Sequence, residues 1–159
     1  MKAVVVTVSD RVSAGTAEDR SGPAAIARLA GHGIEGAVLR VVPDGVESVK
    51  TILEELVAGY DLVVTTGGTG FSPRDLTPEA TRLVIDREAP GLAEAMRTAT
   101  FGRFPHGMLS RGVSGIAGST LIVNLPGSVK AVEESIDVIG PALAHAVELL
   151  IEGKSDHNT

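Results

Sequence analysis

The stretch from Leu62 to Ala80, LVVTTGGTGFSPRDLTPEA, constrains the fold of this chain more than any other. It opens with apolar, mostly β-branched residues, a pattern typical of a strand buried on both faces of a parallel sheet. A glycine-rich loop follows at once, and the run Thr77-Pro78-Glu79 predicts a helix with Thr77 as its N-cap. The order of strand, glycine loop and helix is typical of α/β proteins.

The glycine loop places backbone N–H groups at the carboxyl edge of the predicted sheet, where α/β proteins hold phosphate groups. Arg74 and Asp75 lie in the same loop. An arginine suits phosphate oxygens, and a carboxylate suits Mg²⁺. The loop has neither the spacing of a P-loop nor that of a dinucleotide-binding motif. Phosphate binding and a purely structural turn, in which glycines relieve positive-φ strain, are therefore both open interpretations.

Composition narrows the class of protein. A chain of 159 residues suggests one domain, which we place at 1–152, followed by a polar tail at 153–159. The absence of Cys excludes disulfides and Cys-ligated zinc. The net charge of −6 and the lack of a basic run argue against nucleic-acid binding. Because no apolar run is as long as a membrane helix and the start lacks a signal-peptide pattern, we expect a cytoplasmic protein without membrane contact.

Two further strands also end in polar residues. Residues 3–8 run into Ser9-Asp10-Arg11, and residues 36–42 run into Pro43-Asp44-Gly45. Asp10 and Arg11 are consistent with a site or with an ion pair, and Asp44 is consistent with an N-cap or Asx-turn. Because parallel strands end on the same side of a sheet, Asp44 and Asp75 can face one cleft. Two converging carboxylates could hold Mg²⁺ on a triphosphate.

The remaining chain predicts helices and one more strand. The strand is expected at 119–124, followed by Pro126-Gly127 and a helix with Ser128 as its N-cap. The C-terminal helical region is expected to be divided at Gly140-Pro141. Other helices are predicted from 21 to the glycines at 31 and 33, over about 47–58, over 78–86 and over 92–100. His32 is expected to be solvated, and residues 101–108 are interpreted as a packed connection or an oligomer contact.

With these motifs assembled, the chain resembles the molybdenum cofactor biosynthesis family of MogA/MoaB type. That family includes the G domains of gephyrin and of the plant cofactor-insertion protein. The shared elements are VSDRVSAG after the first strand, PDG after the second, TTGGTGFSPRDLTPEA at the third, and SRG followed by TLIVNLPGSVKA. They cover nearly the whole chain in order, and the TGGTG-x-x-x-RD-x-TPEA pattern is highly specific.

The resemblance implies a three-layer α/β/α fold with a mostly parallel central sheet. It implies a molybdopterin adenylyltransferase, which joins ATP and molybdopterin, releases pyrophosphate and needs Mg²⁺. It also implies a homotrimer that hands its product to a molybdate-inserting protein. The alternatives are a non-catalytic module that binds or delivers molybdopterin, a MoaB-type paralogue, and a general binder of nucleotides or sugar phosphates.

The resemblance also implies which residues form the site. Asp44 and Asp75 match the two family aspartates linked to catalysis, and we expect both to hold Mg²⁺. The residues expected to bind substrates are Ser9, Asp10, Arg11, Thr66, Gly67, Gly68, Thr69, Gly70, Arg74, Ser110, Arg111, Asn124, Gly127, Ser128 and Lys130.

Overall fold

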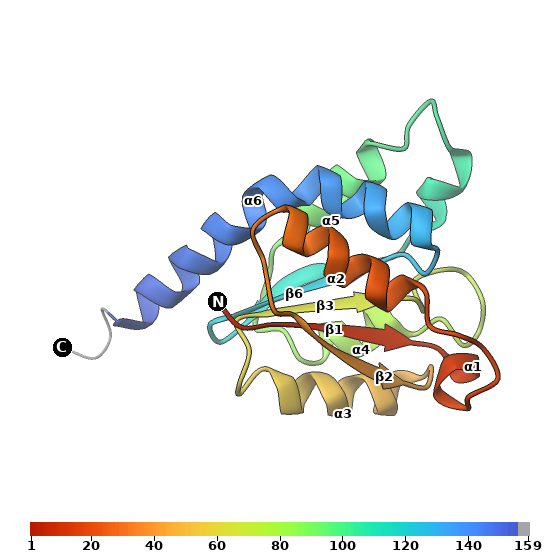
Figure 1. Ribbon diagram of the computed structural model, residues 1–159, viewed down its shortest axis with the longest axis horizontal. Helices are drawn as coiled ribbons and strands as arrows, with labels where there is room; N and C mark the ends of the chain where they lie inside the picture. Colours follow the sequence, from red (N-terminus) through yellow and green to blue (C-terminus); the bar gives the residue numbers. More distant parts are fainter. Residues whose placement is uncertain (156–159) are drawn as a thin grey trace.

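The structure, a computed structural model, describes residues 1–155 and contains a six-stranded sheet between two layers of helices (Figure 1). The strand order is β2-β1-β3-β6-β5-β4. The parallel part comprises β1 (Ala3–Val8), β2 (Val38–Val42), β3 (Leu62–Thr66) and β6 (Thr120–Leu125). The strands β5 (Ser114–Ala117) and β4 (Arg87–Glu88) are added antiparallel. The predicted α/β fold with a mostly parallel sheet is confirmed.

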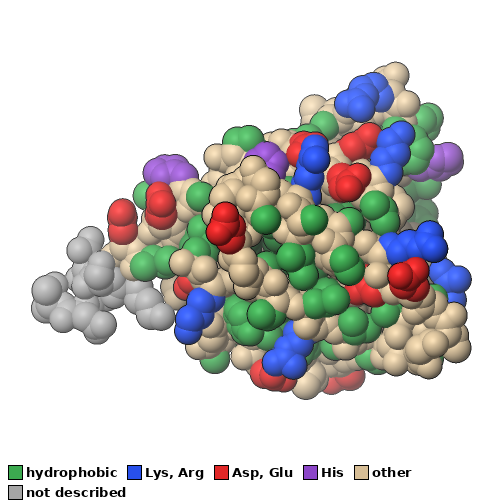
Figure 2. All heavy atoms as spheres, in the orientation of Figure 1, with side chains coloured by type: hydrophobic (Ala, Val, Ile, Leu, Met, Phe, Trp, Pro, Cys, Tyr) green, Lys and Arg blue, Asp and Glu red, His purple; other side chains and the backbone are tan. Residues whose placement is uncertain are grey.

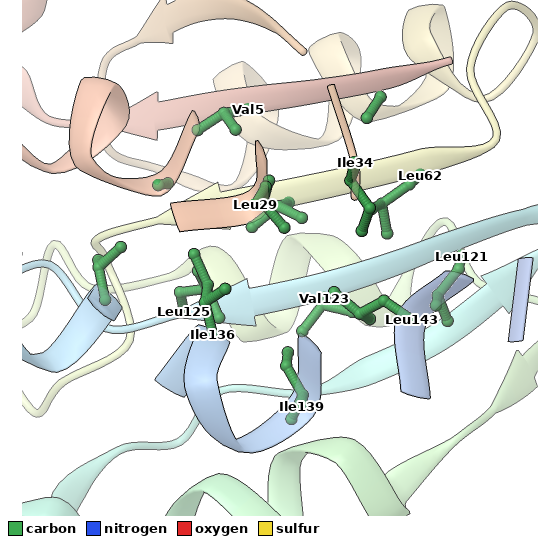
Figure 3. Packing of buried hydrophobic residues seen from close by; sticks show 14 of the residues in the cluster. Val5, Leu29, Ile34, Leu62, Leu121, Val123, Leu125, Ile136, Ile139 and Leu143 are labelled. Atoms are coloured by element: carbon green, nitrogen blue, oxygen red, sulfur yellow. The ribbon is translucent and has the colours of Figure 1, made fainter. Parts of the chain in front are cut away.

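Alternating side chains of the buried strands form a core on each face of the sheet. Val5 and Val64 lie in the cluster under α2 (Ser21–Gly31), α5 (Pro90–Thr98) and α6 (Val129–Ser155). Val4 and Val63 lie in the cluster under α3 (Val46–Leu56) and α4 (Thr77–Arg82). Figure 3 shows strand residues of the first cluster facing side chains of α2 and α6. The strands that carry the predicted site are therefore held rigidly between two helical layers.

The C-terminal helix α6 is continuous from Val129 to Ser155, so the predicted division at Gly140-Pro141 is wrong. Ile139 and Leu143 are buried on either side of the proline, so the apolar face runs through it. Gly140 lets α6 pass the end of α2, because a Cβ there would lie 2.5 Å from the ring of His32. His32 is not simply solvated, since its Nε2 lies 3.2 Å from an Asp137 carboxylate oxygen. Residues 153–155 of the predicted tail continue the helix, and 156–159 lie outside the described residues.

Other differences from the predicted elements are local. The predictions missed β4 and β5, because β4 has only two residues and β5 lies in a glycine-rich run. The polar loop expected after β1 begins with a short helix, α1 (Asp10–Ser13). A 3-10 helix, η1 (Pro105–Leu109), follows α5, and α4 ends at Arg82 instead of 86. Within residues 1–155, no helix is long and apolar enough to cross a membrane.

Candidate functional site

The residues that follow β1 and β2 hold each other by a reciprocal pair of hydrogen bonds. The Asp10 amide donates to Asp44 Oδ2 at 2.9 Å, and the Asp44 amide donates to Asp10 Oδ1 at 3.0 Å. The parallel register that pairs Val8 with Val42 brings these two loops together. The carboxyl ends of the neighbouring strands therefore form one fixed unit.

Arg74 ties the glycine loop to this unit. Its Nε and Nη2 donate to the Asp10 carboxylate at 3.1 Å each, and Nη2 also donates to the Asp44 carbonyl oxygen at 2.8 Å. The hydrogen bond from Arg74 keeps the pKa of Asp10 below its usual value. Asp10 is thus ionised, and it forms its ion pair with Arg74 instead of with its neighbour Arg11.

Asp75 lies near enough to Asp44 for its negative charge to affect the pKa of Asp44. Partial burial raises the pKa of Asp44, and the negative charges of Asp10 and Asp75 raise it further. Asp75 accepts a hydrogen bond from the Ser72 amide at 2.9 Å through Oδ2. Within residues 1–155, the Oδ1 atoms of Asp44 and Asp75 accept no hydrogen bond, so each carboxylate keeps one oxygen for a ligand. Carboxylates that repel one another at such a position favour a bound cation.

The glycine loop combines a tight turn with unused amides. Gly67 and Gly68 have φ of +90° and +68°, and a Cβ on Gly68 would lie 2.2 Å from Thr77 Oγ1. The Gly67 amide donates to the Leu125 carbonyl at 3.2 Å. Within the described chain, the amides of Gly68, Thr69 and Gly70 donate to no protein acceptor. The structural turn and the anion cradle are thus compatible interpretations, because the turn leaves these amides without a protein acceptor in residues 1–155.

Thr77 supports the loop instead of capping α4. Its hydroxyl donates to the Gly67 carbonyl at 3.0 Å, and its amide donates to the Gly68 carbonyl at 3.1 Å. The residue before the helix is Leu76, without a side-chain cap, so the predicted N-cap is wrong. Thr77 is fully buried, and its bonds therefore fix the loop from below.

Arg111 holds the loop from the opposite side. Its amide donates to the Thr69 carbonyl at 2.8 Å, and its Nε donates to the Gly70 carbonyl at 2.8 Å. Its Nη2 donates to the Asp75 carbonyl at 2.5 Å, and the guanidinium also pairs with the Glu79 carboxylate. The hydrogen bond from Arg111 lowers the pKa of Glu79. These bonds commit the Arg111 guanidinium to positioning the loop and Asp75.

A cavity of about 850 Å³ opens beside the glycine loop. It lies between the loop, α5, residues 99–110 and the first turn of α6, and its size suits small-molecule substrates. Ser128 caps α6, as predicted, because its Oγ accepts from the Ala131 amide at 3.3 Å. The predicted site residues that line the cavity are Gly68, Thr69, Gly70, Asp75, Ser110, Gly127, Ser128 and Lys130.

Other predicted residues lie elsewhere. Thr66 and Asn124, both expected to bind substrates, are buried, with 0% and 1% of their surface exposed. The Asn124 amide nitrogen donates to Thr65 and Thr81, both at 3.0 Å. Ser9 caps α1 by accepting from the Val12 amide at 3.2 Å. The remaining residues outside the cavity wall are Asp10, Arg11, Asp44, Gly67, Arg74 and Arg111.

The sequence interpretation missed one wall of the cavity. Residues 99–110, expected in part to be a connection or an oligomer contact, line it with Arg103, Phe104 and His106. Arg97 of α5 also lines it, and its Nη1 donates to the Gly112 carbonyl at 2.7 Å. The sequence signal that could have indicated this wall was the presence of aromatic and basic residues beside glycine and proline in residues 101–108. Figure 2 shows Lys and Arg side chains, with some Asp and Glu, toward the end where the parallel strands of Figure 1 terminate.

Comparison with known proteins gives a consistent match. Residues 4–145 match the family model described as a probable molybdopterin binding domain. The chain is 42% identical to gephyrin of Dictyostelium discoideum over 157 residues, which covers 92% of this chain but only 22% of that protein. It is 43% identical to the molybdopterin adenylyltransferase of Haemophilus influenzae, covering 86% of this chain and 72% of that enzyme. It also superposes on the molybdopterin biosynthesis enzyme MoaB of Thermus thermophilus with a TM-score of 0.88 and 45% identity, covering 94% and 95% of the two chains.

Proposed function

The chain belongs to the molybdenum cofactor biosynthesis family of molybdopterin-binding domains, and we propose that it is a molybdopterin adenylyltransferase. The reaction joins AMP from ATP to the terminal phosphate of molybdopterin and releases pyrophosphate. The observation that carries this proposal is the set of three successive free amides, from Gly68 to Gly70, beside Asp75 at the cavity wall. Such amides bind phosphate oxygens without any positively charged side chain.

The chain's own residues suit a reaction that needs positioning more than proton transfer. An oxygen of the molybdopterin phosphate attacks the α-phosphorus of ATP, and the bond from that phosphorus to the oxygen bridging to the β-phosphate breaks. The attacking phosphate is already anionic, so no general base is required. The loop amides and the capped start of α6 would hold phosphates in line, and Lys130 would add positive charge at the rim.

Asp44 and Asp75 fit a bound Mg²⁺. Among residues 1–155, each carboxylate has one oxygen without a protein partner, and the charge of Asp75 raises the pKa of Asp44. No group of three or more His, Cys, Asp or Glu side chains within residues 1–155 is placed to hold a metal. Mg²⁺ commonly takes only one or two protein carboxylates and completes its shell with phosphate oxygens and water. When bound, it would offset the negative charge of the triphosphate.

The family resemblance adds three further parts to the proposal. They are a homotrimer, transfer of the adenylylated product to a molybdate-inserting protein, and a cytoplasmic location. The exposed Met108, with 56% of its surface accessible, is a candidate for contacts between copies or with that partner.

The direct test incubates the protein with ATP, molybdopterin and Mg²⁺ while pyrophosphate release is measured. We expect molybdopterin-dependent release, and binding of molybdopterin without release would favour the non-catalytic alternative. The variant Asp75→Asn should lower the rate by at least about 30-fold, because one lost charge contact costs ~2 kcal/mol or more. Molybdopterin binding and thermal stability serve as its controls. A rate within about threefold of wild type, with both controls unchanged, would remove Asp75 from the mechanism.

A further inference from the structure

The wall of the cavity has two chemically different parts. One part comprises the glycine loop, Asp75 and the start of α6, and it presents amides and hydroxyls suited to phosphates. The other part comprises residues 99–110, where Phe104 and His106 line the cavity. Their rings are arranged edge to face, with centroids 5.4 Å apart and planes at 68°. Both proposed substrates pair a phosphate with a fused heteroaromatic ring, and Phe104 and His106 are the aromatic side chains among the residues that line the cavity.

Phe104 is held in place by its main chain and not by core packing. Its amide donates to the Thr100 carbonyl at 2.9 Å, and its carbonyl accepts from the Gly107 amide at 3.1 Å. Gly107 lies tightly against Thr100, since a Cβ there would be 2.1 Å from Thr100 Oγ1. The Phe104 side chain nevertheless remains 50% exposed. The bonds fix the backbone that carries the Phe104 ring, and the ring is exposed at a cavity wall, where a planar ligand can stack on it.

The rim beside this ring is positively charged. Glu134 lies 3.9 Å from the Arg103 guanidinium and 4.0 Å from the Lys130 ammonium, so two cations share one carboxylate. All three residues line the cavity, and the two cations are largely exposed. An aromatic surface next to an excess positive charge suits a planar ring that carries a phosphate. It is less suited to a purely apolar partner.

We propose that Phe104, supported by His106, is the stacking platform for the fused nitrogen heterocycle of a substrate, either the purine of ATP or the pterin. This proposal deepens the proposed function and rests on it for the choice of rings. It makes Phe104 a specificity-determining residue, while the glycine loop binds the phosphates. Phe101 does not line the cavity although it is 63% exposed in the same segment, and it therefore provides a matched control.

The first experiment uses the absence of tryptophan from this chain. The variant Phe104→Trp introduces a single tryptophan whose fluorescence should be quenched, with saturation, by AMP or by 6-hydroxymethylpterin. Inorganic pyrophosphate, which has no ring, should leave that fluorescence unchanged. The variant Phe101→Trp should respond to none of these probes. The arm with AMP and the arm with the pterin decide which substrate ring occupies the platform.

The second experiment measures affinity by calorimetry. Phe104→Ala should weaken binding of the responding ring ligand by about 5- to 150-fold, the range for a lost base–aromatic contact, and leave pyrophosphate binding unchanged. Phe104→Trp should restore the affinity, and Phe101→Ala should match wild type.

Wild-type affinity for both ring ligands in Phe104→Ala, or equal quenching at 101 and 104, would overturn the proposal. A changed molecular mass of Phe104→Ala in sedimentation, with ring affinity intact, would also overturn it and assign the ring to contact with a second copy. Because these readouts need no turnover, absence of adenylyl transfer would refute the proposed function separately.

Discussion

Replacing Arg111 with alanine should destabilise the protein, because the structure commits its guanidinium to the glycine loop. The change removes the bonds to the carbonyls of Gly70 and Asp75 and the ion pair with Glu79. Since a third of the side chain is exposed, we take about 1–1.5 kcal/mol for each carbonyl bond and ~0.5 kcal/mol for the ion pair. The sum is about 3 kcal/mol, which corresponds to a decrease in Tm of roughly 6–12 °C for a chain of this size.

The assay is urea unfolding at a fixed protein concentration, with calorimetric Tm as a second measure. Arg111→Lys keeps the charge but cannot reach all three acceptors, so it should lose about half as much free energy of unfolding. Arg11→Ala, which removes an exposed arginine, should stay within about 0.5 kcal/mol of wild type. If Arg111→Ala keeps wild-type stability and instead shows a raised KM for molybdopterin, Arg111 contacts the substrate as the resemblance implied, and the anchoring argument is wrong.

Two further predictions concern charge. Asp44→Asn should lower adenylyl transfer by at least about 30-fold. It should not lower Tm at pH 7. Because the pKa of Asp44 is raised in the folded protein, its ionised form destabilises the native state above pH ~4, and the substitution removes that ionised form. Thermal scans at pH 7 and pH 4 check this, and a marked drop in Tm at pH 7 would contradict it. The bonds from Arg28 and His32 lower the pKa of Asp137 to about 2, so its contribution to stability is present above pH ~4 and is lost as the pH falls toward 2. Urea unfolding of wild type and Asp137→Asn should show a difference at pH 6 that shrinks at pH 3, and a constant difference would count against the linkage.

The sequence was most informative where function depends on local pattern and sheet topology. The run from Leu62 to Ala80 predicted its strand, loop and helix because apolar residues, glycines and Thr-Pro-Glu each act on their immediate neighbours. The proximity of Asp44 to Asp75 followed from the common direction of parallel strands. These inferences need no knowledge of distant packing.

The features that the sequence did not predict depend on distant partners. Arg111 was expected to bind a substrate, but its acceptors Gly70 and Glu79 lie 41 and 32 residues earlier in the chain. Gly140 was expected to break a helix, yet its lack of a side chain leaves room for the ring of His32 at the end of α2. The cavity wall at Phe104 depends on how residues 99–110 sit relative to α6, which no local pattern specifies.

The length of α6 has a practical consequence. Its 27 residues span about 40 Å, and its first turn lines the cavity while its last turns project from the other end of the molecule (Figure 1). The last fully buried core residue that it contributes is Val147, and Leu150 packs against the core only partly buried. A biosensor surface or affinity resin coupled through this end would therefore hold the protein at the end of α6 remote from the turn that lines the cavity.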